Sequence, residues 1–95
     1  MSVVPLLDLP QLRDELERCE TMSASRSLLP MLRRALVRHY HLVPYNSLQA
    51  APLGLQHQYQ QNLTALTAPA RFPAPNWDVQ YAQTEQALAV LEGLA

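Results

Sequence analysis

The amino-acid sequence predicts a small all-α protein, an antiparallel bundle of three to four helices with a proline-rich connector. Several stretches carry apolar residues at spacings of three and four, which is the period of an amphipathic helix. No segment alternates apolar and polar residues for long enough to predict a strand. The eight prolines stand at the starts of the apolar stretches or between them, where they separate helices.

Length and composition limit the size and the location of the protein. A chain of 95 residues with 48% hydrophobic residues is expected to form one domain, residues 1–95. It carries a net charge of −1 and therefore has no general attraction to nucleic acid or to an anionic membrane. No apolar stretch approaches the roughly 20 residues that span a bilayer. The first residues lack the basic region of a signal peptide, and a cytoplasmic location is expected.

The first helix is predicted over residues 9–22. Asp8 is suited to cap it, Gln11 completes an Asp-x-x-Gln capping box, and Pro10 stands in the first turn, where its missing N–H costs nothing. Two opposite-charge pairs at a spacing of four are expected on the outside, Arg13 with Glu17 and Asp14 with Arg18. The apolar face consists of Leu9, Leu12, Leu16 and Cys19.

The second helix is predicted over residues 28–42, after a serine-rich turn in which Ser25 or Ser27 is expected to be the cap. Pro44 ends it. Its apolar stripe consists of Leu29, Leu32, Leu36 and Tyr40, and its other faces carry Arg33, Arg34, Arg38, His39 and His41.

Two further helices complete the predicted bundle. The third, over residues 53–67, has the stripe Leu55, Tyr59, Leu63 and Leu66, and a short helical turn over residues 47–51 precedes it. The last, over residues 77–92, is capped by Asn76 or Asp78 and followed by Gly93 as the C′ residue. Between them, prolines favour an extended strap over residues 68–76, with Phe72 as its apolar anchor.

Charge is distributed unevenly along the chain. Residues 8–20 carry five acids against two arginines, residues 26–38 carry four arginines and no acid, and residues 78–95 carry three acids. One interpretation is that the second helix lies between the acidic first and last helices, which neutralise its arginines. The other is that part of the arginine face is exposed and docks an acidic partner.

The middle of the chain has aromatic residues and almost no charge. Between residues 39 and 77 the single charged residue is Arg71. Aromatic side chains on a charge-poor surface are typical of the centre of a protein–protein interface, although a small bundle also needs aromatics in its core. The candidate partner-binding residues are Tyr45, Tyr59, Phe72 and Trp77 as apolar anchors, with Arg33, Arg34 and Arg38 as electrostatic guides.

The residue types and spacings of common catalytic and metal sites are missing. A metal site would need His39, His41, His57 and Cys19 to converge, and two histidines two residues apart diverge on a helix. Cys19 lies on an apolar stripe beside acidic residues that raise a thiol pKa, so it is expected in the core. Neither a glycine-rich phosphate loop nor a nucleophile motif is present. We therefore expect no enzyme, no cofactor and no bound metal.

The sequence thus favours a non-catalytic protein–protein interaction module: an accessory subunit, adaptor or assembly or chaperone-type factor. Its partner would be another protein or a second copy of itself, because a chain this short gains from burying apolar surface against a partner. The alternative is a regulator that contacts nucleic acid through the arginine face of the second helix. Against it, the third helix carries no arginine and follows a connector too long for a helix-turn-helix.

Overall fold

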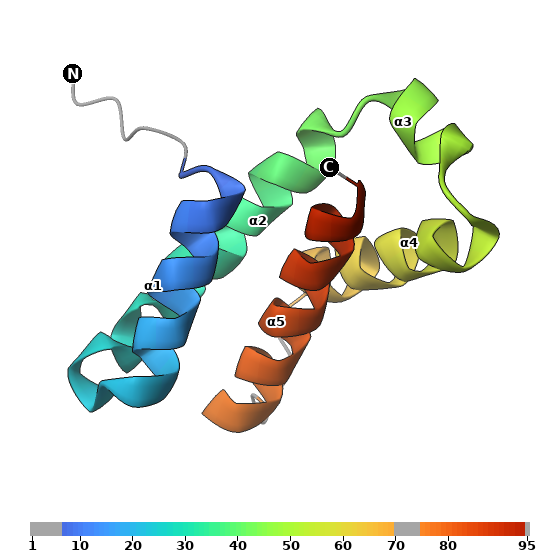
Figure 1. The fold of residues 1–95 in the computed structure, drawn as a ribbon. Helices are drawn as coiled ribbons and strands as arrows, with labels where there is room; N and C mark the ends of the chain where they lie inside the picture. The colour runs from blue at the N-terminus through green and yellow to red at the C-terminus, as the bar shows by residue number, and fades with distance from the viewer. Residues whose placement is uncertain (1–6, 70–74, 95) are drawn as a thin grey trace, which may run out of the picture.

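The fold is helical throughout the part of the chain that the computed structural model describes, residues 7–69 and 75–94. In chain order the elements are α1 (Leu9–Thr21), a 3₁₀-helix η1 (Ser23–Leu28), α2 (Leu29–Leu42), the short α3 (Tyr45–Ala50), α4 (Leu53–Thr67) and α5 (Trp77–Leu94). Within those residues there is no strand. The predicted all-α fold is confirmed. The bundle is not antiparallel throughout, because α2 and α5 run in the same direction (Figure 1), and most of the predicted proline strap lies outside the described residues.

The capping residues of α1 and α5 act as predicted. The Asp8 carboxylate accepts a hydrogen bond from the backbone N–H of Gln11 at 2.8 Å, and the Gln11 side chain accepts one from the Asp8 N–H at 3.0 Å. Asn76 caps α5, because its side-chain oxygen accepts a hydrogen bond from the Val79 N–H at 2.9 Å. Backbone donors that α1 and α5 cannot satisfy internally are thus bonded by polar side chains.

Three local predictions at helix ends were wrong. The serine-rich turn is the 3₁₀-helix η1, which leads directly into α2, so neither Ser25 nor Ser27 caps α2 and no side chain does. An N-cap residue normally has an extended backbone. Because η1 runs directly into α2, no extended residue precedes α2 to serve as its cap. Gly93 lies inside α5, which continues to Leu94, and it lies beside Leu55 of α4. The short helix begins at Tyr45, two residues before the predicted turn.

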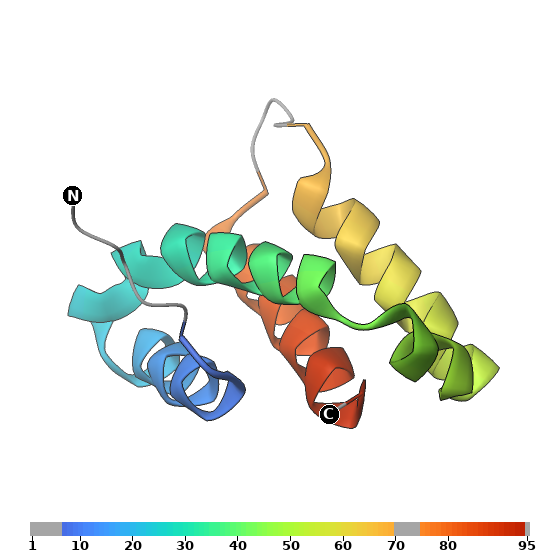
Figure 2. The ribbon, with the colours of Figure 1, turned by 90° about the horizontal axis from the view of Figure 1, so that it is seen from above.

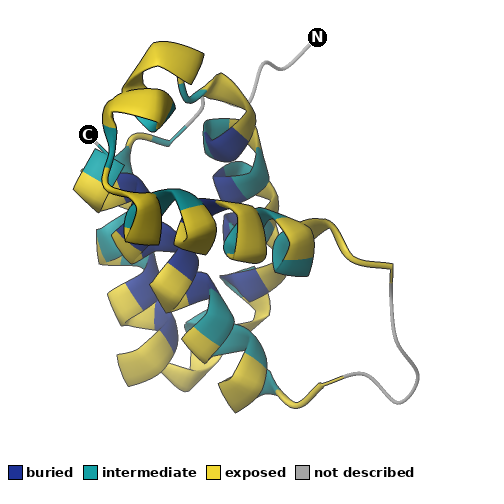
Figure 3. Ribbon diagram, turned by 90° about the vertical axis from the view of Figure 1, so that its right-hand side faces the viewer, coloured by how far each residue is buried: buried dark blue, intermediate teal, exposed yellow. Residues whose placement is uncertain are grey.

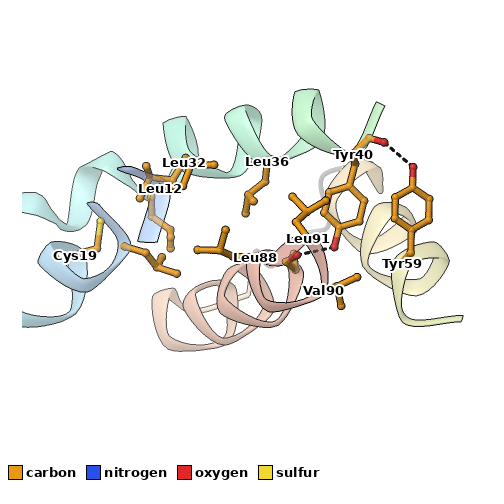
Figure 4. Close-up of a cluster of buried hydrophobic side chains, with 12 residues drawn as sticks. Leu12, Cys19, Leu32, Leu36, Tyr40, Tyr59, Leu88, Val90 and Leu91 are labelled. Carbon is orange, nitrogen blue, oxygen red and sulfur yellow. Dashed lines mark hydrogen bonds between the residues drawn. The ribbon is translucent and has the colours of Figure 1, made fainter. Parts of the chain in front are cut away.

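The apolar stripes of α1, α2 and α5 meet in one core (Figure 4). Each fully buried leucine removed from water contributes about 1.5–3 kcal/mol. Fewer buried residues come from α4, which contributes only Tyr59 to this set. The buried residues are Leu12, Leu16, Cys19, Leu29, Leu32, Leu36, Tyr40, Tyr59, Thr84, Ala87, Leu88, Val90 and Leu91.

The helices are arranged around α2. In Figure 1 the chain descends along α1 and ascends along both α2 and α5, while α4 crosses the bundle. Figure 2 shows α1 and α5 on the same side of α2. Buried residues face the inside of the bundle, and the outer side of each helix is exposed (Figure 3). The outer side of α2 is therefore turned away from α1 and α5.

Candidate protein-docking surface

Tyr59 is not a surface anchor, contrary to the sequence-based prediction, because it is buried in the core. Its ring stacks on Tyr40 with centroids 4.9 Å apart. Its hydroxyl donates a hydrogen bond to the Tyr40 carbonyl oxygen at 2.6 Å (Figure 4). A tyrosine in a partly apolar interior packs its ring and pairs its hydroxyl, and here that pairing holds α4 against α2.

Trp77 is half-buried, and its side chain contacts other residues of the same molecule. Its indole N–H donates to the Arg26 carbonyl oxygen at 3.1 Å, and the Arg26 guanidinium lies 4.5 Å from the centre of its ring. On α5 the ring stacks on Tyr81 with centroids 5.1 Å apart. These contacts fasten η1 to the start of α5 and leave little of Trp77 for a partner. Phe72 lies outside the described residues.

Tyr45 has the exposure that a partner-binding residue needs. It is 70% exposed at the start of α3, and its hydroxyl accepts a hydrogen bond from the Gln49 amide at 2.8 Å. Its ring makes none of the aromatic stackings found among the described residues. Of the three predicted aromatic anchors that the structure describes, Tyr45 is the one whose ring is presented to solvent.

Of the three arginines predicted to guide a partner, one bonds within the molecule and two are exposed to solvent. Arg33 is half-buried, and its guanidinium donates to the Gln80 carbonyl at 3.0 Å and to the Thr84 hydroxyl at 3.1 Å, both on α5. Burial lowers the pKa of Arg33. Arg34 and Arg38 are exposed. Arg33 therefore ties α2 to α5, and Arg34 and Arg38 face solvent.

No acidic side chain neutralises the arginines of α2, and the interpretation that α1 and α5 do so was wrong. All eight Asp and Glu residues lie in the described part of the chain. The ion pairs within 4.0 Å there are Arg13 with Glu92 and Arg18 with Glu15. The two predicted pairs at a spacing of four in α1 do not form, because Arg13 pairs with Glu92 of α5 and Arg18 pairs with Glu15. The acidic helices are thus joined through Arg13, and α2 keeps its positive charge.

A second stripe on α2 lies opposite its buried stripe. Met31, Arg34, Arg38 and Leu42 follow one another at spacings of three, four and four, and all four are exposed. At 100° per residue these positions fall on one side of the helix. We call this set the outer α2 face. Met31 is 39% and Leu42 64% exposed, so two large apolar side chains flank two arginines.

Sequence reasoning missed Met31 and Leu42 as members of this surface. The sequence did contain the signal, since Met31 and Leu42 lie three and four residues from Arg34 and Arg38, the same spacings that separate the buried leucines. The apolar side of this helix was predicted from the stronger stripe on its opposite side, which consists of Leu29, Leu32, Leu36 and Tyr40. Arginine, methionine and tyrosine are enriched at protein interfaces, and Tyr45 follows three residues after Leu42, at the start of α3.

The groups that could carry chemistry are separate from one another. Within the described residues, no three His, Cys, Asp or Glu side chains lie close enough together to hold a metal ion. Cys19 is fully buried, its thiol donates to the Ser25 carbonyl, and burial raises its pKa, so its place in the core is confirmed. His39 bonds to the Leu7 carbonyl, whereas His41 and His57 are exposed on different helices.

One hollow on the surface lies between α4 and α5. It has a volume of about 360 Å³. Side-chain amides dominate its rim, and Leu55, Ala89 and Val90 form its apolar part; the amides are Gln58, Gln61, Asn62 and Gln86. No charged side chain of the described residues lines this hollow, so it offers no ionic contact to a ligand.

Comparisons with protein-family models, with curated proteins and with solved structures find no match to this chain. Among the residues that the structure describes, no helix is both long and apolar enough to cross a membrane. The outer α2 face is therefore the basis for a functional proposal.

Proposed function

We propose that this chain is a small non-catalytic interaction protein, an accessory subunit, adaptor or assembly factor, that binds another protein chain through the outer α2 face. The observation that carries the proposal is the pair Arg34 and Arg38, exposed and without a carboxylate partner, between exposed Met31 and Leu42. Apolar contact supplies affinity, and the arginines select a partner with acidic groups at matching positions.

The single cysteine supports a reducing compartment as the place of action. Cys19 is an unpaired thiol in the core, and no disulfide is needed to hold the helices. We therefore place the interaction in the cytoplasm as part of the same proposal.

The test is affinity capture with the intact protein and with the double variant Arg34→Glu, Arg38→Glu. Protein partners captured by the wild type should be lost by this variant, because its reversed charges repel acidic groups. The matched control is Asp14→Arg, Glu17→Arg on the exposed side of α1, which changes as many charges but leaves the outer α2 face intact. Equal capture by all three proteins would contradict the proposal.

The second candidate function is contact with nucleic acid, which the uncompensated arginines of α2 also favour. Two exposed arginines are few beside the 6–10 phosphate contacts of a typical DNA-binding protein, so affinity would be weak. Titration of duplex and single-stranded DNA at low salt distinguishes the two functions. Binding that weakens steeply with salt and is lost in the Arg34→Glu, Arg38→Glu variant would favour this candidate over a protein partner.

A further inference from the structure

We infer that the partner of the outer α2 face is a second copy of this chain, which presents the outer side of its α5. This inference rests on the proposed function and names the partner that it leaves open. The argument is one of charge complementarity between two exposed helix faces of the same molecule, each with apolar side chains beside its charges.

The outer side of α5 carries the charges that α2 lacks. Asp78, Glu85 and Glu92 recur at intervals of seven, so they form a row along one edge of the helix, and all three are exposed. Glu92 is paired with Arg13. Asp78 and Glu85 form no ion pair with any described residue. One end and the middle of α5 thus offer two carboxylates to an approaching arginine.

The same side of α5 also has room for an approaching helix. Val79 is 45% exposed, and the positions that follow it on this side, Ala82 and Ala89, are exposed and have short side chains. The hollow between α4 and α5 borders Ala89. Met31 and Leu42 of the second copy therefore have apolar surface to cover while its arginines reach the acidic row.

The spacing of the charges is compatible with this pairing. Arg34 and Arg38 are four residues apart, about 6 Å along the axis at 1.5 Å per residue. Asp78 and Glu85 are seven residues apart, about 10 Å by the same rise. A long arginine side chain spans the difference, so both pairs form when α2 of one copy lies along α5 of the other.

These charges cannot pair within one molecule. The buried sides of α2 and α5 pack against each other, so their outer sides point in opposite directions (Figure 2). The contact therefore joins unlike faces of two copies. After one contact each pair of molecules retains one free α2 face and one free α5 face, so association continues into closed rings or open chains.

The experiment is sedimentation equilibrium of the purified full-length chain at rising concentration, at about 50 mM and about 500 mM salt. We expect concentration-dependent association at low salt that weakens by about tenfold or more at high salt, because the paired charges are screened. A protein that stays monomeric at every concentration at low salt would overturn the inference.

Charge-reversed variants identify the faces. Arg34→Glu, Arg38→Glu makes both faces acidic, and Asp78→Arg, Glu85→Arg makes both basic, so each variant alone should be monomeric. Mixing the two should restore association, since acidic α2 then meets basic α5. Restoration requires both variants to be folded, so it also answers the objection that a variant had merely unfolded. Separate, folded variants that fail to associate when mixed would overturn the inference.

The control is again Asp14→Arg, Glu17→Arg, which reverses two carboxylates of α1 and should associate as the wild type does. If the wild type is monomeric and still captures a different protein through Arg34 and Arg38, self-association is overturned and the proposed function stands. If association occurs but survives both reversals unchanged, the assignment of these two faces is overturned.

Discussion

Tyr40 shows how much of this fold depends on single residues. Its ring stacks on Tyr59, its hydroxyl donates a hydrogen bond to the Ala87 carbonyl of α5 at 2.8 Å, and its own carbonyl accepts the hydroxyl of Tyr59. One buried residue of α2 therefore contacts both α4 and α5. Because both hydroxyls are paired, two polar groups are buried without the cost of an unsatisfied donor.

The tyrosines predict how stability changes at high pH. Burial, followed by the nearby Tyr59, raises the pKa of Tyr40. Burial, the hydrogen bond to Glu20 and the charges of Glu20 and Glu85 raise the pKa of Tyr81 to about 12. Unfolded tyrosines lose their protons near pH 10, before the folded ones do, so the folded state binds more protons above that pH. Stability is then complete below about pH 10 and falls above it, by up to about 1.4 kcal/mol per pH unit for the buried Tyr40 and by less for Tyr81, which solvent partly screens.

This dependence is measured as the free energy of unfolding by urea between about pH 8 and about pH 11. The variants Tyr40→Phe and Tyr81→Phe remove one titrating group each and should flatten the decline. A decline equally steep in both variants and the wild type would show that other groups cause it. Tyr40→Phe should also cost about 1 kcal/mol at neutral pH, since it loses the hydrogen bond to Ala87.

Among the elements, α2 is the one whose two sides differ most in their surroundings. Its buried side joins α1, α4 and α5 through Leu29, Leu32, Leu36 and Tyr40. Its opposite side, the outer α2 face, is exposed and forms no ion pair with a described residue. Arg33 lies between these sides and binds α5 through neutral oxygens. Arginines close together in sequence thus have different surroundings according to their angle around the helix.

That difference predicts unequal effects of two similar substitutions on the free energy of unfolding. Arg33→Met should destabilise the protein by roughly 1–2 kcal/mol, because it removes charged hydrogen bonds to Gln80 and Thr84. Arg34→Met should change stability by less than about 0.5 kcal/mol, because this side chain is exposed. The measurement is urea unfolding followed by circular dichroism. Equal losses in both variants would mean that Arg33 does not tie α2 to α5.

At the scale of the whole molecule, one small core joins all the long helices. The radius of gyration is 13.6 Å, and the buried side chains form a single cluster. A domain of this size is stable by only about 5–15 kcal/mol, so the loss of one large core residue removes a substantial part of that stability. Because every long helix contributes to the same cluster, we expect the helices to unfold together.

The substitution Leu36→Ala tests this expectation. Leu36 is 1% exposed at the centre of the core, and its truncation should cost about 2–5 kcal/mol. In the variant, helix content by circular dichroism and the fluorescence of Trp77, the single tryptophan, should still be lost in one coincident transition. Two separate transitions would show that α5 has a stability of its own.

The sequence predicted the elements well where the determinants are local. Asp8, Gln11 and Asn76 cap helices because each bonds a backbone group three residues away, and the leucine stripes recur at the helical period. Those signals lie within a few residues of one another. The candidate site was predicted less well, because the exposure of Tyr59 or Arg33 depends on residues far away in the chain, Tyr40 in one case and Gln80 in the other.

Sequence alone therefore determined that the chain is helical, where most of its helices begin and end, and which side of each is apolar, because helix formation is governed by neighbouring residues. Only the tertiary structure decided which charges remain without partners. Arg13 turned to Glu92 across 79 positions, Arg33 turned to α5, and Arg34 and Arg38 were left in solvent. An ion pair forms only when packing brings its two groups within reach, and that packing is a property of the folded chain as a whole.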